Sequence, residues 1–590
     1  MQRMAYKNFT DEEAALLREF IFTNPNGNDG FVYPQPLVAG EELSPLMSAV
    51  SRTHVSMQDR TLDFIDKEKP EQARALMPQI RQLIDVFRMP DGTLRTSRRT
   101  TEFNREWVIL HGHGSIKEGT MMFGHSEEIS DIGVKLITGH PLAHPQVKST
   151  RYISYKKKLD DALKDEDLAS LPDVGRFLEH VDRLNKRYLE FQERIADAVF
   201  GHPYTEKVVE YLRRPEQVEA EVQKWAAGRR KIEENFEATP ERLKAERQRV
   251  LKSLEQKGVR ADIAKFALDY ARVYLPAANR TSVVFSVDAR TLEEIITSLI
   301  SSPRSEDRAR GYSIWTEAKK LAPVLLGERS HIKIDEWRLK AEQELREYCN
   351  GQFGHLPPRN RSDGTVNLLH PGNIEQYTDR FNAALIVFQY TDLALQDIME
   401  TLTEGQVREV LARAHQDRSD YDIIHPAVSH GGLMAELVMG YHGYRDMFRH
   451  RRGSRTTQRL TTRLGFETPE IFKVFGLDKE YQADMAEAAI FYEEARVHSP
   501  YVAELLVPFG ANCRALHSWQ PNQMGYVGNL RGKAATGNIA YVDTTRELMR
   551  KVGELMPETA KQFRVDDKEY PAELWKKGYS WFDAEGRGGK

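Results

Sequence analysis

The sequence predicts a helix-rich α+β protein made of two similar halves. Apolar residues recur three and four positions apart through most of the chain, which is typical of amphipathic helices. Short stretches such as 282–287 (SVVFSV) have the β-branched and aromatic content of strands. One order of segments, with helices leading to a Gly/His-rich patch, precedes and follows a Gly/Pro/Asn-rich stretch at 350–375, which indicates an internal duplication.

Composition limits the class of protein. With 590 residues, 40% of them hydrophobic and 29% charged, the chain is long enough for two or three globular domains. The formal net charge of −4 excludes a global affinity for nucleic acid. Two cysteines, Cys349 and Cys513, exclude a disulfide framework and favour a reducing cytoplasm. The longest apolar run, at 383–388, is too short to cross a bilayer.

The predicted elements follow in chain order. Thr10 and Glu13 predict a capping box at the start of the first helix, in a sequence without a signal-peptide pattern. Helices are expected over 47–67, 70–87, most of 175–270, 291–300 and 310–326. We expect a helical extension at 1–44, domains at 45–345 and 376–578, a charged helical insertion at about 175–265, a linker at 346–375, and a disordered tail at 579–590.

The most unusual stretch runs from Arg445 to Leu464 (RDMFRHRRGSRTTQRLTTRL), which is rich in arginine, contains no lysine and has Asp446 as its single acid. Guanidinium groups bind phosphate through paired planar hydrogen bonds, so arginine without lysine favours phosphate recognition. A basic solvated helix face is the alternative. A metal site at His111 and His113 is not favoured, because no acid or cysteine follows at ligand spacing.

The arginine stretch resembles the signature RHRxxSxNExSxRY of flavin-dependent thymidylate synthases, through Arg449-His450-Arg451 and Ser454. The first half carries the complementary pieces. His113 to Glu118 (HGSIKE) looks like the family's HxSxxE, and Ser149 to Tyr152 (STRY) matches SxRY. Gly139-His140-Pro141 stands ten residues before Ser149, where RHR is expected.

Two further elements of the first half resemble the family. Residues 271–276 (ARVYLP) resemble ARxxLP, and 288–290 (DAR) resemble the flavin-contacting NxR. The catalytic arginine expected nine positions later is Leu299 in the first half. In the second half, Asn522 takes the last NxR position, and the ninth residue after it is Arg531.

The resemblance implies two diverged copies of a fold with a small sheet and long helices. It implies reductive methylation of dUMP with FAD as cofactor and with methylenetetrahydrofolate and NADPH as cosubstrates. Arg531 would be catalytic. The substrate would be held by Ser149, Arg151, Tyr152, Arg272 and Arg449, and the flavin by Arg449, His450, Arg451, Ser115, Asp288 and Arg290. Family members are homotetramers with sites between subunits, so we expect composite sites between the halves and a homodimer of this chain.

Three alternatives stay open from the sequence. The chain could be a nucleotide- or flavin-binding pseudoenzyme, since Leu299 replaces the expected arginine and both signatures lack the Asn/Glu pair. It could transfer one carbon to another pyrimidine nucleotide. The third alternative, a nucleic-acid-binding module around 445–463, is disfavoured by the near-neutral charge and by the lack of interleaved aromatic residues.

Overall fold

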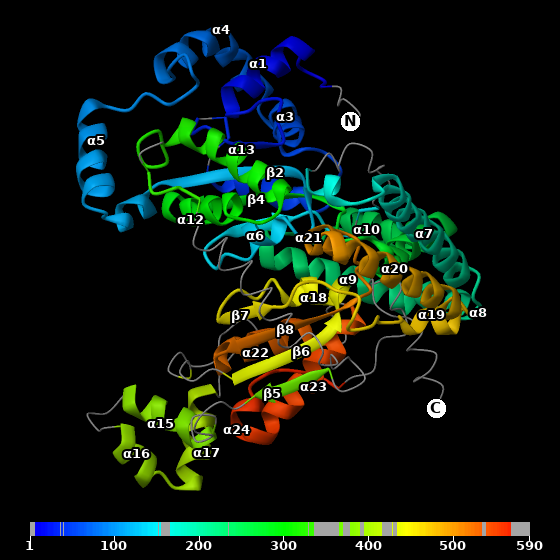
Figure 1. The fold of residues 1–590 in the computed structure, drawn as a ribbon. Coiled ribbons are helices and arrows are strands. Elements are labelled where there is room, and N and C mark those ends of the chain that lie inside the picture. Colours follow the sequence, from blue (N-terminus) through cyan, green and yellow to red (C-terminus); the bar gives the residue numbers. More distant parts are fainter. Residues whose placement is uncertain are drawn as a thin grey trace. The chain divides into compact units, whose positions relative to one another are not determined.

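The computed structural model describes most of the chain, namely residues 6–35, 37–38, 40–150, 153–154, 166–233, 235–327, 330–334, 365–369, 378–389, 395–415, 428, 433–533 and 538–567. Several predictions fall outside these residues: Arg151, Tyr152, Cys349, most of the 346–375 linker and the 579–590 tail. Helices predominate, with two small antiparallel sheets (Figure 1). The helix-rich α+β class is therefore confirmed.

The chain divides into two compact units that are each built from separate segments. Unit 1 comprises Met1–Asp182, Pro276–Pro358 and Phe491–Val507, and unit 2 comprises Arg183–Leu275, Arg359–Ile490 and Pro508–Lys590. The units therefore cut across the two halves of the sequence. Arg183–Leu275 lies before the predicted linker but belongs to unit 2.

Unit 1 is organised around a four-stranded antiparallel sheet in the order β1-β2-β4-β3. Its strands are β1 (Asp29–Phe31), β2 (Met121–Ser130), β3 (His144–Val147) and β4 (Arg280–Asp288). The predicted strand at 282–287 is the body of β4. Side chains alternate across it: Val283, Phe285 and Val287 join one core cluster, while Val284 joins another. Both faces of β4 are thus buried.

Helices cover the two faces of this sheet (Figure 1). One core cluster contains residues of α12 (Ala289–Ile300) and α13 (Ser305–Leu321), which confirms the predicted helix at 291–300. The other contains residues of α1 (Asp11–Ile21), α2 (Leu43–Val50), α3 (Met57–Glu68) and α4 (Pro70–Phe87). The predicted Thr10–Glu13 capping box and the helix at 70–87 are present. The helix predicted over 47–67 is two helices, because Ser56 caps a new one.

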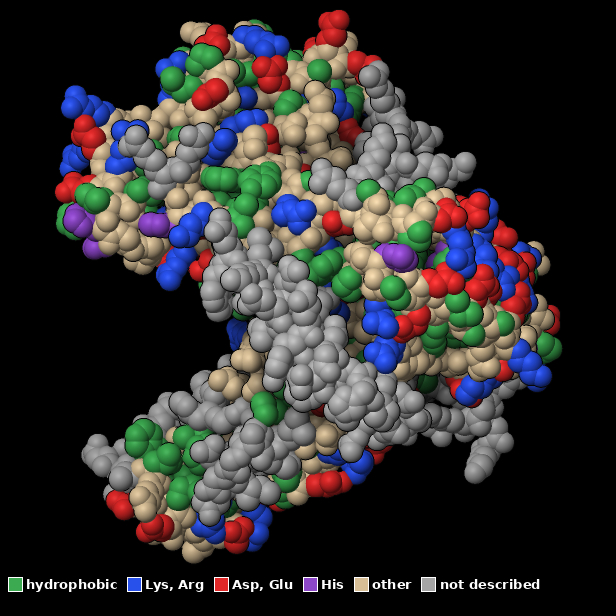
Figure 2. Space-filling view, viewed as in Figure 1, with side chains coloured by type: hydrophobic (Ala, Val, Ile, Leu, Met, Phe, Trp, Pro, Cys, Tyr) green, Lys and Arg blue, Asp and Glu red, His purple; other side chains and the backbone are tan. Residues whose placement is uncertain are grey.

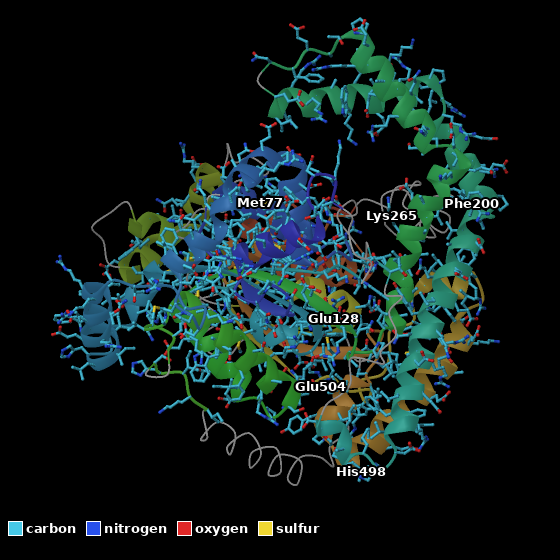
Figure 3. All side chains as sticks on the ribbon, turned by 90° about the horizontal axis from the view of Figure 1, so that it is seen from above. Met77, Glu128, Phe200, Lys265, His498 and Glu504 are labelled. Carbon is cyan, nitrogen blue, oxygen red and sulfur yellow. The ribbon has the colours of Figure 1, made fainter. Side chains whose placement is uncertain are left out.

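A buried carboxylate joins β2 to this helical layer. A β-bulge interrupts β2 between Glu127 and Ile129, and the inserted Glu128 has φ 56° (Figure 3). The Glu127 carboxylate accepts a hydrogen bond of 2.8 Å from the backbone N–H of Met57. Burial raises the pKa of Glu127 from 4.5 to about 7.

Glu127 therefore makes stability depend on pH in a defined direction. The pKa of Glu127 is higher in the folded protein than in the unfolded chain. Its contribution to the free energy of unfolding is therefore fully present below about pH 4.5 and is lost as the pH rises through about 7. Glu127→Gln keeps the acceptor and removes the ionisation. We expect the variant to gain up to about 3 kcal/mol relative to wild type between pH 5 and 8, measured by denaturant unfolding. A difference between the two proteins that does not vary with pH would contradict this.

Unit 2 contains a second four-stranded antiparallel sheet, in the order β5-β6-β8-β7. Its strands are β5 (Val366–Leu369), β6 (Leu433–Gly440), β7 (Ser454–Thr457) and β8 (Asn512–Trp519). The helices α18 (Tyr441–Met447), α22 (Pro521–Arg531), α23 (Ile539–Leu555) and α24 (Pro557–Ala560) belong to the same unit.

The two sheets agree in register as well as in strand order. Advancing β4 by 232 residues and β3 by 310 residues places their partner pairs on those of β8 and β7. For β2, an advance of 310 residues fits Ile129 and Ser130, and an advance of 311 fits the residues before the bulge, because β6 has no bulge at this place. Thus Ser130↔Arg280 corresponds to Gly440↔Asn512, and His144↔Ser286 corresponds to Ser454↔Ser518. This correspondence lets each position in unit 2 be compared with one in unit 1.

The charged region at 175–270 forms long helices, as predicted: α7 (Val174–Phe200), α8 (Pro203–Leu212), α9 (Pro215–Ile232), α10 (Pro240–Ser253) and α11 (Gln256–Ala271). Within unit 2, α7 ends beside α11, where the Arg260 guanidinium lies 4.1 Å from the centre of the Phe200 ring (Figure 3). The apolar stripe of α7 is buried, at Val181, Leu184, Tyr188, Phe191 and Ile195. Its polar surface mixes acidic and basic side chains (Figure 2).

Among the described helices, none combines the length and the apolar character that a membrane span requires.

Candidate functional site

Three arginines from separate parts of the sequence surround one buried carboxylate in unit 2. Asp446 lies on α18. Its Oδ1 is 3.6 Å from Nε of Arg449 and 4.0 Å from Nη1 of Arg531, and its Oδ2 is 3.9 Å from Nη2 of Arg272. These separations correspond to ion pairs and are longer than hydrogen bonds. We call Asp446, Arg272, Arg449, Arg531 and His450 the arginine cluster.

Local structure explains how each arginine is positioned around Asp446. Arg272 begins the 3-10 turn Arg272–Tyr274 that follows α11. This turn is fixed by two backbone hydrogen bonds of 2.8 Å, from Gly510 N–H to Val273 O and from Phe509 N–H to Leu275 O. Arg531 is the last residue of α22, and Arg449 lies two residues after the end of α18. The cluster is therefore held by helix ends and a pinned turn.

His450 fixes the orientation of Arg531. Its Nε2 accepts a hydrogen bond of 3.1 Å from Nε of Arg531, so the imidazole proton must be on Nδ1. Burial, and then the positive charge of Arg531, lower the pKa of His450 to about 3. The ring therefore stays neutral at physiological pH and acts as an acceptor.

The charges of the cluster favour an anion. Arg272 also pairs with Asp269 at 3.1 Å, so three guanidinium groups face two carboxylates. Arg451 follows His450, and its pKa is lowered by burial and then by the charge of Arg449. Burial falls across the cluster: the side chain of Arg272 is 2% exposed, that of Arg531 is 15% and that of Arg449 is 60%. Such an arrangement can bind an anion with one end buried and the other near solvent.

Asp446 is the functional candidate that sequence reasoning missed. The available signal was its position as the only acid in the arginine stretch, three residues before Arg449. Asp269 has the same spacing to Arg272. On a helix, residues three apart face each other, so both acids could have been proposed as counter-ions.

Asp446→Asn tests whether this carboxylate neutralises the cluster. We expect a loss of about 2–4 kcal/mol in unfolding free energy at low ionic strength, because the guanidinium groups lose their shared counter-ion. Added inorganic phosphate should raise the melting temperature more in the variant than in wild type. Glu470→Gln, which removes an exposed partner of Lys473, is the matched control. Equal melting temperatures for both variants, with equal responses to phosphate, would refute the assignment.

The predicted site residues of unit 1 have other surroundings. Ser149 is buried, and its N–H donates to Ser51 O at 3.0 Å. Ser115 is exposed in the 3-10 helix Gly114–Gly119. Arg290 pairs with Glu118 at 2.6 Å. Asp288 caps α12 by accepting a hydrogen bond from the backbone N–H of Thr291.

The positions of unit 1 that correspond to the cluster carry different side chains. In the correspondence between the two sheets, Gly139 of unit 1 is equivalent to Arg449, Leu136 to Asp446, and the buried Leu299 to Arg531. Arg272 corresponds to Glu504. The backbone N–H groups of Ala277 and Ala278 donate hydrogen bonds of 2.9 Å to Val507 O and Leu505 O, in the same pattern that fixes the 272–275 turn in unit 2.

The acid at 504 has its own buried partner. Glu504 lies 3.6 Å from Nη1 of Arg304, whose Nε donates to Asp307 at 2.8 Å. Two carboxylates here face one guanidinium group, the reverse of the excess in unit 2. His140, at the position of His450, contacts Glu294 at 2.8 Å. This place in unit 1 is therefore unsuited to an anion.

The comparisons with known proteins agree with the motifs. A family model described as "Thymidylate synthase complementing protein" matches residues 81–324. This segment is similar to the thymidylate synthase complementing protein family. The family is the flavin-dependent thymidylate synthase family, so the resemblance read from HGSIKE, STRY and ARVYLP is confirmed.

Relatives extend beyond the matched segment. The UPF0159 protein Ta1429 of Thermoplasma acidophilum is 22% identical over 450 residues, which are 74% of this chain and 82% of that protein. A UPF0159 protein of Chlamydia pneumoniae is 23% identical over 306 residues, 49% of this chain and 55% of that protein. The solved structure of a UMP/dUMP methylase PolB from Streptomyces cacaoi, bound with 5-Br dUMP, matches with a TM-score of 0.26 and 13% identity. The match covers 34% of this chain and 93% of that one.

The described residues contain no group of three or more metal-ligating side chains. His111 and His113 instead lie against Trp107, with ring centroids 5.3 Å and 5.4 Å from the indole.

Proposed function

We propose that this chain is a thymidylate synthase-like methyltransferase that acts on a pyrimidine nucleotide at the arginine cluster of unit 2. The preferred reaction is reductive methylation of dUMP, with FAD as cofactor and methylenetetrahydrofolate and NADPH as cosubstrates. The convergence of Arg272, Arg449 and Arg531 on one place is the observation that supports it, together with the family match. One-carbon transfer to another pyrimidine nucleotide is the nearest alternative.

Arg272 is the proposed phosphate ligand. Its guanidinium is the most buried of the three, and its turn is fixed by backbone hydrogen bonds, so it loses little freedom when it binds a dianion. In unit 1, Ser149, Arg151 and Tyr152 match the family's SxRY element, and this motif alone predicts them as phosphate ligands.

Arg531 is the proposed catalytic residue. Making C5 of a uracil ring nucleophilic places negative charge on the ring, and a fixed guanidinium stabilises that charge without reorganising during the reaction. His450 supplies the orientation by accepting the Arg531 Nε–H. A thiolate route has no support in unit 2, because Cys513 is buried in β8.

The residues at the exposed edge of the cluster fit a flavin diphosphate. Arg449 is largely exposed. Burial, and then the charge of Arg449, lower the pKa of Arg451, and a bound anion would favour the charged guanidinium. Arg449 and Arg451 would hold the diphosphate. The family motifs also predict Ser115, Asp288 and Arg290 of unit 1 as flavin contacts. When bound, the flavin supplies the redox chemistry of the methyl transfer.

The matched registers lead us to propose that the two units are diverged copies of one ancestor, of which only unit 2 keeps the cluster. Each chain should then bind one nucleotide. Calorimetric titration with dUMP should give a stoichiometry near one per chain. Two equivalent sites per chain would contradict the proposal.

Arginine substitutions test the roles directly. Arg531→Ala should lower turnover by about 10²–10³-fold, the loss typical of a group that stabilises developing charge. Arg272→Ala should raise the dissociation constant for dUMP by at least about ten-fold, because a charge-assisted contact to phosphate is lost. Arg550→Ala, at an exposed pair with Glu554, is the control. Wild-type turnover in the Arg531 variant would overturn the catalytic assignment.

A binding protein without transferase activity is the second candidate, supported by the loss of the cluster in unit 1. Purified protein that carries a flavin and binds dUMP, but forms no product with folate and NADPH, would identify it. Colourless protein that cannot be reconstituted with FAD would count against both readings.

A further inference from the structure

We propose that Tyr274 and Asp484 form a clamp that positions Arg272 for the nucleotide phosphate, and that the charged helices of unit 2 exist in part to build it. The inference rests on the proposed function and assigns positioning residues to the same site. Neither residue touches the substrate in this proposal.

The clamp acts on the turn that carries Arg272. Arg272 and Tyr274 belong to the same 3-10 turn, closed by the hydrogen bond of 3.0 Å from Leu275 N–H to Arg272 O. Because the turn spans so few residues, fixing the Tyr274 side chain fixes the backbone from which Arg272 projects.

The Tyr274 hydroxyl is anchored on α20 (Asp478–His498). It donates to Oδ2 of Asp484 at 2.8 Å, and the same oxygen accepts from Nε of Arg187 on α7 at 2.8 Å. Burial, followed by the charge of Asp484, raises the pKa of Tyr274, so the phenol remains a donor throughout the physiological range. The anchor is thus a charge-assisted bond to a carboxylate that has its own counter-ion.

Arg187 is in turn held by the charges of both helices. It pairs with Glu480 on α20 and, at 2.8 Å, with Glu190 on α7, and Arg194 reaches Glu480 at 2.7 Å. The acids of α20 and the arginines of α7 therefore do more than solvate a surface. Within unit 2 they fix the carboxylate to which Tyr274 donates.

Aromatic rings leave Tyr274 little freedom to move. Its ring centroid lies 4.6 Å from that of Phe191 and 5.3 Å from that of Tyr481, and Phe472 contacts both neighbours at 5.3 Å and 5.2 Å. The ring is fully buried. Its hydroxyl therefore points to one partner, and removing that oxygen leaves the packing intact.

A double-mutant cycle separates positioning from simple packing. Tyr274→Phe should raise the dissociation constant for dUMP about five-fold, the effect of one lost orienting hydrogen bond. In an Arg272→Ala background the same change should have no effect, because the clamp acts through Arg272. Tyr211→Phe, at a half-exposed tyrosine of α8, is the matched control and should leave binding unchanged. Full-length protein and calorimetric titration with dUMP and with inorganic phosphate serve all variants.

The outcomes discriminate between the hypotheses. Unchanged affinity in Tyr274→Phe, or an equal loss with and without Arg272, overturns the clamp while leaving the proposed function intact. Unchanged affinity in Arg272→Ala instead overturns the proposed phosphate site itself. Asp484→Asn, which weakens the anchor from the other side, should reproduce the Tyr274→Phe pattern and replaces that variant if it folds poorly.

Discussion

The arginine cluster depends on how the charge of Asp446 is shared. Guanidinium groups that approach one another in a buried place repel, and desolvation adds to that cost. Asp446 lies within ion-pair distance of Arg272, Arg449 and Arg531, and Asp269 also pairs with Arg272, so two carboxylates hold three guanidinium groups together. Two carboxylates do not neutralise three guanidinium groups, and this excess of positive charge favours a further anion. The same shortage of negative charge that strains the cluster supports the proposed nucleotide site.

Unit 1 shows what the same framework becomes without that arrangement. The strand order and registers match, yet Leu136, Gly139 and Leu299 occupy three of the cluster positions. Glu504 stands at the fourth and has Arg304 as its partner. Apolar packing and an ion pair between two buried side chains can stabilise a fold without a bound ligand. The contrast indicates that the arginines of unit 2 are not needed for the fold as such.

The charged helices acquire a role from their contacts. In sequence, 175–270 reads as amphipathic helix with mixed charges, a composition common on solvated surfaces. In unit 2, Arg187 and Arg194 of α7 face acids of α20, and one of those acids accepts the Tyr274 hydroxyl. Charged residues that the sequence alone assigns to packing or to a solvated surface thus connect, within unit 2, to the turn bearing Arg272.

The sequence by itself determined the local features. The capping box at Thr10, the helix at 70–87, the strand at 282–287 and the buried stripe of α7 all follow from short-range periodicity and capping, which are encoded within a few residues. The family motifs also identified Arg272, Arg449 and Arg531 individually. Only the tertiary structure brought them together and added Asp446. The tertiary structure also assigns residues 183–275 to the unit of the second sheet. Contacts between segments far apart in sequence depend on the path of the chain, which local sequence patterns do not specify.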